Sequence, residues 1–224
     1  IIKEILTASK LDDEKRLGEI LDEMRSRSRM RLEGASHSAA VARACSYFSP
    51  VRAFDDMTGG IEYFHFLEKT ADAYSKDEKF RKELICKLKE TAKKLFAADN
   101  LMVGYTADEE GYKALPEELK KFKAALSDKP SRRYAFEFVP ELKNEGFKTS
   151  SKVNYVARCG SFDAEAYTGA LEVLKVIMNY EYLWQNLRVI GGAYGCMSNF
   201  GRSGTGCLVS YRDPKLAATD KIYE

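Results

Sequence analysis

The stretch AYGCMSNFGRSGTGCLVSYR, residues 193–212, decides the fold class of this chain. Two strand-length segments, 193–200 and 205–212, flank the glycine-rich segment 201–204, and this combination predicts a β-hairpin. Pro214 follows the second segment and predicts the start of a final helix, because a proline in the first helical turn loses no needed hydrogen bond. We therefore expect paired strands followed by a helix.

Two segments upstream of the hairpin alternate with a period of two, which is the side-chain period of a strand. Their alternating positions are Tyr134, Phe136 and Phe138, and Val153, Tyr155 and Ala157. Between them and the hairpin, apolar residues recur at helical spacing and predict a helix. These residues are Tyr167, Leu171, Leu174 and Met178. The last hundred residues should thus combine strands and helices.

The preceding part of the chain is predicted to be mostly helical, because three apolar stripes recur at helical spacing. They are Leu17, Ile20, Leu21 and Met24; Phe80, Leu84, Leu88, Ala92 and Leu95; and Leu115, Leu119, Phe122 and Leu126. The short apolar run 101–105 predicts a buried strand. The period changes across 127–130, so we predict two domains, 1–128 and 129–224. The predicted fold class is α+β, an antiparallel sheet with packed helices.

Composition excludes several classes of function. The 224 residues carry 36 Lys and Arg against 34 Asp and Glu, so the net charge of +2 gives no field that would attract nucleic acid or an anionic membrane. No apolar run approaches the about 20 residues needed to cross a bilayer, and no signal-peptide pattern is present. Both ends lie in helical patterns, so we expect a piece of a longer chain.

The five cysteines contain no CxxC pair, which argues against a zinc ribbon and a disulfide framework and favours a reducing compartment. They are Cys45, Cys86, Cys159, Cys196 and Cys207. No cysteine has a histidine near it in sequence, so a cysteine nucleophile is not favoured. Buried thiols that act as small apolar side chains are the simpler interpretation.

The segment HFLEK, residues 65–69, is one residue short of the inverted zinc motif HxxEH. Lys69 stands where the second histidine ligand should be, and an ammonium has no lone pair to offer a metal. His37 is the only other histidine. An ordinary helix is therefore expected here, and no metal site is predicted in this chain.

The run RSRSRMR, residues 25–31, resembles an arginine–serine segment that binds RNA. On a helix, however, alternate residues point to different faces, and acidic residues in 12–23 can pair with these arginines at neighbouring turns. A solvated, ion-paired helix end is the favoured interpretation, and a nucleic-acid-binding module is the alternative.

Two glycine-rich loops, 191–195 and 201–206, lack the sequence of a phosphate-binding loop. The second is more simply a hairpin turn. The first places Tyr194 directly after Gly192 and Ala193, six residues beyond Arg188, where a helix is predicted to give way to a strand.

The segment LWQNLRVIGGAYG, residues 183–195, is similar to the presequence-protease branch of the pitrilysin/insulinase-type zinc metallopeptidases. The resemblance continues through GCLVSYRDP, residues 206–214. It extends upstream to 34–40, 59–63 and 100–103, in the same order along the chain.

The resemblance implies four related α+β domains of the processing-peptidase type, arranged as two halves that close on unfolded peptides. Zinc and the HxxEH motif belong to the first domain, in an N-terminal half that this chain does not include. Residues 1–128 would be the end of the third, helix-rich domain, and 129–224 the start of the fourth. Neither zinc nor another cofactor is expected in the chain itself, and the expected partners are peptide substrates and the N-terminal catalytic half.

The resemblance also implies that Arg188 and Tyr194 reach the peptide near the scissile bond. Arginine and tyrosine donors can stabilise the negative charge that develops on a carbonyl oxygen during hydrolysis. Gly191 and Gly192 would let the substrate backbone approach closely. In the alternative interpretation, Arg188 pairs with an acid and Tyr194 packs in the core.

We therefore predict a substrate-binding, zinc-free part of a peptide-degrading metalloendopeptidase, inactive when alone. The alternative is a non-catalytic, peptide-binding scaffold subunit of a homologous complex. The reduced cysteines suit a bacterial cytoplasm, with an organelle matrix as the other expected location.

Overall fold

The computed structural model describes residues 1–128 and 134–224. The chain divides into two compact units, each built from two segments. Unit 1 consists of Ile1–Glu23 and Lys69–Phe136, and unit 2 of Met24–Glu68 and Glu137–Glu224. The helices α2 (Glu14–Gly34) and α5 (Ile61–Lys76) contribute residues to both units. The predicted boundary at residue 128 between two related domains stays a prediction.

Unit 1 is helical within the described residues. In addition to parts of α2 and α5, it contains α1 (Ile2–Ala8), α6 (Glu78–Leu95), the short helix η1 (Ala98–Asn100) and α7 (Glu109–Lys123). Its small core is formed by Leu21, Ala71 and Tyr74, against which Leu17, Phe80 and Leu84 pack. The first two predicted apolar stripes therefore contribute Leu17, Leu21, Phe80 and Leu84 to this core, while Ala71 and Tyr74 come from α5. Asp77 begins α6 by accepting hydrogen bonds from the backbone of Lys79 and Phe80.

Unit 2 contains a three-stranded antiparallel sheet with the order β1–β3–β2. The strands are β1 (Ala157–Ser161), β2 (Gly195–Gly201) and β3 (Thr205–Tyr211). The helices of unit 2 are α3 (Ser36–Ser46), α4 (Pro50–Gly59), the short η2 (Ala164–Ala166), α8 (Gly169–Ile177), η3 (Met178–Ile190) and α9 (Leu216–Ile222). The predicted α+β class is confirmed.

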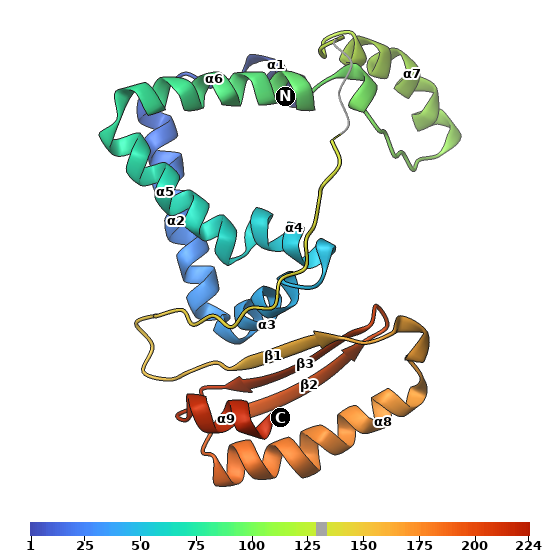
Figure 1. The fold of residues 1–224 in the computed structure, drawn as a ribbon. Coiled ribbons are helices and arrows are strands. Elements are labelled where there is room, and N and C mark those ends of the chain that lie inside the picture. Colours follow the sequence, from blue (N-terminus) through green and yellow to red (C-terminus); the bar gives the residue numbers. More distant parts are fainter. Residues whose placement is uncertain (129–133) are drawn as a thin grey trace. The chain divides into compact units, whose positions relative to one another are not determined.

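The sheet lies between helices on its two faces, with α3 on one and α8 on the other (Figure 1). Side chains alternate along β3, so Cys207 faces α3 while Leu208 packs into the core on the opposite face. That core contains Val156, Leu183, Leu187, Ala193 and Tyr223. Leu183 and Leu187 are four residues apart on η3, a π-helical segment that continues α8.

The predicted hairpin is confirmed as the antiparallel pair β2 and β3. The two strands pair from Gly195 opposite Tyr211 to Gly201 opposite Thr205. Gly204 has a φ of +75° and closes the turn, which is a conformation that favours glycine. The final helix begins two residues after Pro214, at Leu216.

Two predicted strands are wrong. Residues 101–105 form no strand, and Met102 and Val103 are exposed. Residues 134–138 are likewise without strand pairing, and Tyr134 is 70% exposed. The physical reason is that a period of two, or a short apolar run, makes a strand only where a sheet edge offers hydrogen bonds. In the segment 153–157, regular pairing begins only at Ala157.

Arg43 organises the helical part of unit 2. Its guanidinium lies 2.6 Å from Asp56 of α4, 2.8 Å from Glu145 and 3.6 Å from Glu62 of α5. Burial disfavours the charge of Arg43, but its hydrogen bonds with Glu145 and Asp56 outweigh burial and raise its pKa. This arginine therefore joins α3 to three other segments of the same unit.

Among the described residues, none of the helices combines the length and the apolar character that crossing a bilayer requires.

Replacing Arg43 by alanine should lower the free energy of unfolding of unit 2 by about 3–5 kcal/mol, the typical cost of removing one partner of a buried ion pair. The side chain of Asp56 is only 3% exposed and would be left buried without that cation. Trp184, the single tryptophan, lies in unit 2, so its fluorescence during urea unfolding measures this effect.

Lys82→Ala is the matched control, because it removes the solvent-exposed ion pair with Glu78 on α6. Such a pair contributes little to stability, because water screens both charges. If Arg43→Ala lowers the free energy of unfolding as little as Lys82→Ala does, Arg43 does not hold unit 2 together as described.

The ion pair of Glu145 with Arg43 leads to a prediction about how stability depends on pH. Hydrogen bonds from Arg43 are the main reason why the pKa of Glu145 is lowered from its ordinary 4.5 to about 2. A carboxyl whose pKa is lower in the folded state stabilises the fold above its unfolded pKa, and that contribution disappears as the pH falls through the folded pKa. Stability should therefore be lost between about pH 4.5 and 2, and less steeply in Glu145→Gln.

Urea unfolding followed by Trp184 fluorescence at about pH 6 and at about pH 3 compares the two proteins. Equal losses of the free energy of unfolding in the wild type and in Glu145→Gln would refute the prediction.

Candidate functional site

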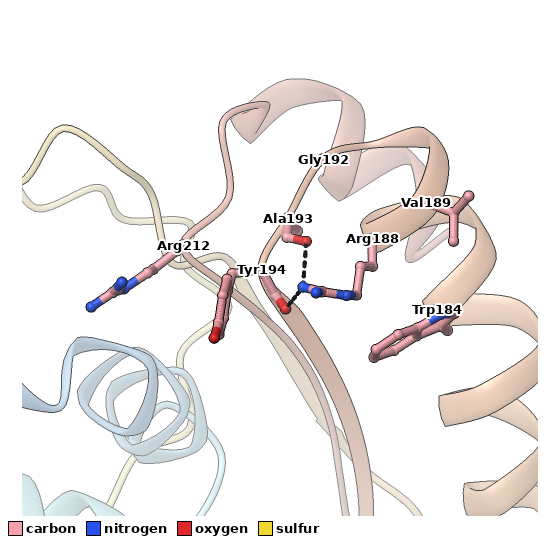
Figure 2. Close-up of a pocket in the computed structure, with 7 residues that line it drawn as sticks. All are labelled: Trp184, Arg188, Val189, Gly192, Ala193, Tyr194 and Arg212. Atoms are coloured by element: carbon pink, nitrogen blue, oxygen red, sulfur yellow. Dashed lines mark hydrogen bonds between the residues drawn. The ribbon is translucent and has the colours of Figure 1, made fainter.

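Arg188 and Tyr194 line one open pocket of about 570 Å³ in unit 2, where η3 gives way to β2 (Figure 2). The lining residues are Trp184, Arg188, Val189, Gly192, Ala193, Tyr194 and Arg212. The pocket therefore contains two arginines, a tyrosine and a tryptophan, and no acidic residue is among its described lining.

The helix end that carries Arg188 is fixed by its backbone. The carbonyl of Arg188 accepts a hydrogen bond from the amide of Gly192 at 3.1 Å, and that of Leu187 accepts one from Ala193 at 2.9 Å. Gly192 has a φ of +85°, the left-handed conformation with which many helices end. At Gly191, a Cβ would lie 2.4 Å from the carbonyl oxygen of Leu187. Both glycines are thus required by the turn itself, and their predicted contact with substrate stays a prediction.

The guanidinium of Arg188 lies between two aromatic rings. Its Cζ is 4.8 Å from the ring centroid of Trp184 and 5.1 Å from that of Tyr194. Nη1 donates hydrogen bonds to the backbone carbonyls of Ala193, at 3.5 Å, and of Tyr194 (Figure 2). Within the described part of the chain, Arg188 forms no ion pair with an acid. Arg188 therefore stabilises the backbone that presents Tyr194 and has no carboxylate partner among the described residues.

Tyr194 is held by its backbone and exposed at its side chain. Its amide donates to the carbonyl oxygens of Tyr211 and Arg212, at 3.0 and 3.4 Å, just beyond the first pair of the β2–β3 ladder. The side chain is 64% exposed, and its hydroxyl makes no hydrogen bond with a residue that the structure describes. The phenol is thus available as a donor at the pocket.

Arg212 is a pocket residue that the sequence analysis missed. Its Cζ lies 5.8 Å from the ring centroid of Tyr194 and 5.5 Å from that of Tyr211. The signal was present in the hairpin: if Gly195 pairs with Tyr211, the residues just outside that pair, Tyr194 and Arg212, must lie close together. Cation and ring therefore alternate along the pocket from Trp184 through Arg188 and Tyr194 to Arg212, which also contacts Tyr211 outside the lining.

Asp213 fixes the backbone beside Arg212. It is 1% exposed, and its carboxylate accepts hydrogen bonds from the amide of Lys215, at 2.8 Å, and from the hydroxyl of Thr219, at 2.5 Å. Its backbone pairs with Asn154 in both directions at 2.8 Å. Arg212 itself has a φ of 50°, which is uncommon for a residue with a side chain. The position of this second arginine is thus determined by buried hydrogen bonds.

The incomplete zinc motif, residues 65–69, and the arginine run, residues 25–31, lie in the α-helices α5 and α2. His65 and Lys69 are part of α5, where the imidazole of His65 packs 6.1 Å from the ring of Phe147. In the arginine run of α2, Arg29 forms an ion pair with Glu68 at 3.0 Å and Arg31 donates to the carbonyl of Gly59. These contacts agree with the favoured interpretation of the run as an ion-paired helix end.

Three of the cysteines form a cluster that the sequence analysis did not find. The sulfur atoms of Cys45, Cys159 and Cys207 all lie within 4.8 Å of one another. Hydrogen bonds from the thiols of Cys159 and Cys207 lower the pKa of Cys45. No spacing rule connects residues so far apart; the available signal was the strand pairing that places Cys159 opposite Cys207.

Comparison with known proteins gives matches at both ends of the chain. The family model for the associated domain of M16 peptidases, subfamily C, matches residues 1–69, and the model of the PreP C-terminal domain matches residues 144–224. The protein HypA of Clostridium perfringens is 32% identical over 226 residues, which cover 100% of this chain and 23% of that protein.

Presequence proteases are also among the relatives. Presequence protease 1, chloroplastic/mitochondrial, of Arabidopsis thaliana is 28% identical over 98% of this chain and 20% of its own length. The mitochondrial presequence protease of Saccharomyces cerevisiae is 24% identical over 81% of this chain and 19% of its own length. The chain thus spans about a fifth of the length of these relatives. With both domain models matched in order, the chain belongs to the presequence-protease type of M16 peptidases and carries sequence of their C-terminal part.

Proposed function

We propose that this chain is the substrate-binding, zinc-free part of a metalloendopeptidase that degrades unfolded peptides, and that Arg188 and Tyr194 act on the peptide at the scissile bond. The observation that carries the proposal is the geometry of the pocket. An exposed phenol without a described hydrogen-bond partner stands beside a guanidinium that has no described carboxylate to neutralise it.

The proposed chemistry follows from these donors. Attack of water on a peptide carbonyl moves negative charge onto the carbonyl oxygen, and donors that already point at that position lower the barrier. The Tyr194 hydroxyl can donate one hydrogen bond, and Arg188 retains donors beyond the Nη1 group that holds the backbone. Arg212 adds a second positive charge to the same pocket.

Zinc would supply the activated water, from residues of the N-terminal half that lie outside this chain. The segment 65–69 does not fit this ion, because Lys69 occupies the position of the second histidine. The chain alone is therefore proposed to be inactive. The pocket would become a working site only when the two halves close on a peptide and exclude water.

The alternative proposal is a peptide-binding scaffold subunit without catalysis, and the open pocket suits both roles. The discriminating observation is whether the intact protein carries HxxEH with a downstream glutamate. As to location, relatives carry mitochondrial or chloroplast names, and one is from Clostridium perfringens. A bacterial cytoplasm stays a prediction.

Tyr194→Phe in the intact enzyme should lower kcat by about 10²-fold, the typical cost of losing one transition-state donor. The ring remains to stack on Arg188, so KM for an unfolded peptide should change little. Steady-state kinetics with a fluorogenic peptide measures both constants. Tyr112→Phe on α7, which removes another exposed hydroxyl, is the control and should be silent. An unchanged kcat in Tyr194→Phe would count against the proposed role.

Arg188→Ala should also lower kcat by about 10²-fold or more, because it removes a donor and the bonds that hold the Tyr194 backbone. Arg202→Ala is the matched control, since Arg202 stacks on Tyr167, 5.7 Å from its ring centroid, away from the pocket lining. If both variants retain wild-type turnover, or lose it equally, Arg188 has no specific role.

A further inference from the structure

The three-cysteine cluster is built from three separate elements of unit 2. Cys159 of β1 lies directly opposite Cys207 of β3 in the strand register, so both side chains are on the same face of the sheet. Cys45 reaches that face from α3, and its sulfur is 3.4 Å from the sulfur of Cys207. The fold thus brings residues from both segments of unit 2 to one point.

The sulfur positions suit a single metal ion. With metal–sulfur bonds of about 2.3 Å, three sulfurs around one ion are roughly 3.8–4.0 Å apart, whether the geometry is tetrahedral or trigonal. The observed sulfurs are within 4.8 Å of one another, with one pair at 3.4 Å. Binding would therefore require the sulfur–sulfur distances to change by about 1 Å or less.

The surroundings decide which ion fits. Cys45 is 2% and Cys207 8% exposed, and Cys159 is half-buried, so water has limited access as a further ligand. Among residues 1–128 and 134–224, no histidine, aspartate or glutamate joins the three sulfurs. Structural zinc sites almost always have four protein ligands, so three thiolates are one ligand short for zinc, whereas Cu(I) is a soft ion that thiolates also select.

We propose that Cys45, Cys159 and Cys207 form a largely buried three-thiolate site for a soft metal ion, with monovalent copper as the ion that the ligand set favours. Binding forms three copper–sulfur bonds and releases the thiol protons to solvent, without electron transfer. The bound ion would tie α3 to the sheet on the face opposite the core that supports η3.

Competition with a chromogenic Cu(I) chelator under anaerobic, reducing conditions tests the proposal on the full chain. One Cu(I) per chain should be withdrawn from the chelator. The metal should also raise the midpoint of thermal unfolding, because it binds the folded state. Cys159→Ser should weaken binding by more than the about 10–100-fold that loss of an outer-shell partner costs.

Cys86→Ser and Cys196→Ser are the controls, because Cys86 is exposed on α6 and Cys196 packs against the core on the opposite face. Both should bind Cu(I) like the wild type. Circular dichroism establishes that each variant is folded, and stabilisation of the unmutated chain by Cu(I) provides a readout that needs no variant. Absence of that stabilisation, equal loss of affinity in the control variants, or tighter binding of Zn(II) would each overturn the proposal.

Discussion

The pairing of β3 with a strand on each side is the constraint on which unit 2 depends. β3 exchanges backbone hydrogen bonds with β1 and β2, and both of its faces are covered. Ser210 illustrates the degree of burial: it is 0% exposed, and its amide and hydroxyl both bond to the backbone of Val156, at 2.8 and 3.3 Å. Because a shift of one residue would exchange the two faces, this register determines both the pocket and the cysteine cluster.

The end of β3 transmits this constraint to the pocket. Beyond the last ladder pair, the chain must turn toward α9, and the buried carboxylate of Asp213 fixes that turn through Lys215 and Thr219. Arg212 is thereby held in a left-handed conformation beside Tyr194. On the other side, the capped end of η3 holds Arg188. The pocket is therefore the meeting point of two chain reversals, each stabilised by backbone hydrogen bonds.

The sequence predicted features that depend on local patterns and missed those that depend on pairing. The hairpin and the helix before it were predictable, because glycine turns and apolar spacing are local signals. Residues 101–105 and 134–138 have the pattern of strands but no sheet edge that pairs with them. Arg188 and Tyr194 came from family resemblance, while Arg212 and the cysteine cluster required the register of β3, which no local pattern specifies.

The Arg188 guanidinium and the Tyr194 phenol lie at an open pocket, as expected if another part of the protein completes the proposed site. In water, an unpaired phenol or guanidinium is hydrated and costs the fold little. The same donors interact much more strongly once water is excluded, because the local dielectric falls. The Nη1 bonds of Arg188 to the Ala193 and Tyr194 carbonyls hold the guanidinium against the backbone that carries the phenol. Under the proposed function, a guanidinium already held beside the phenol would meet a carbonyl oxygen with little reorganisation, which favours electrostatic catalysis.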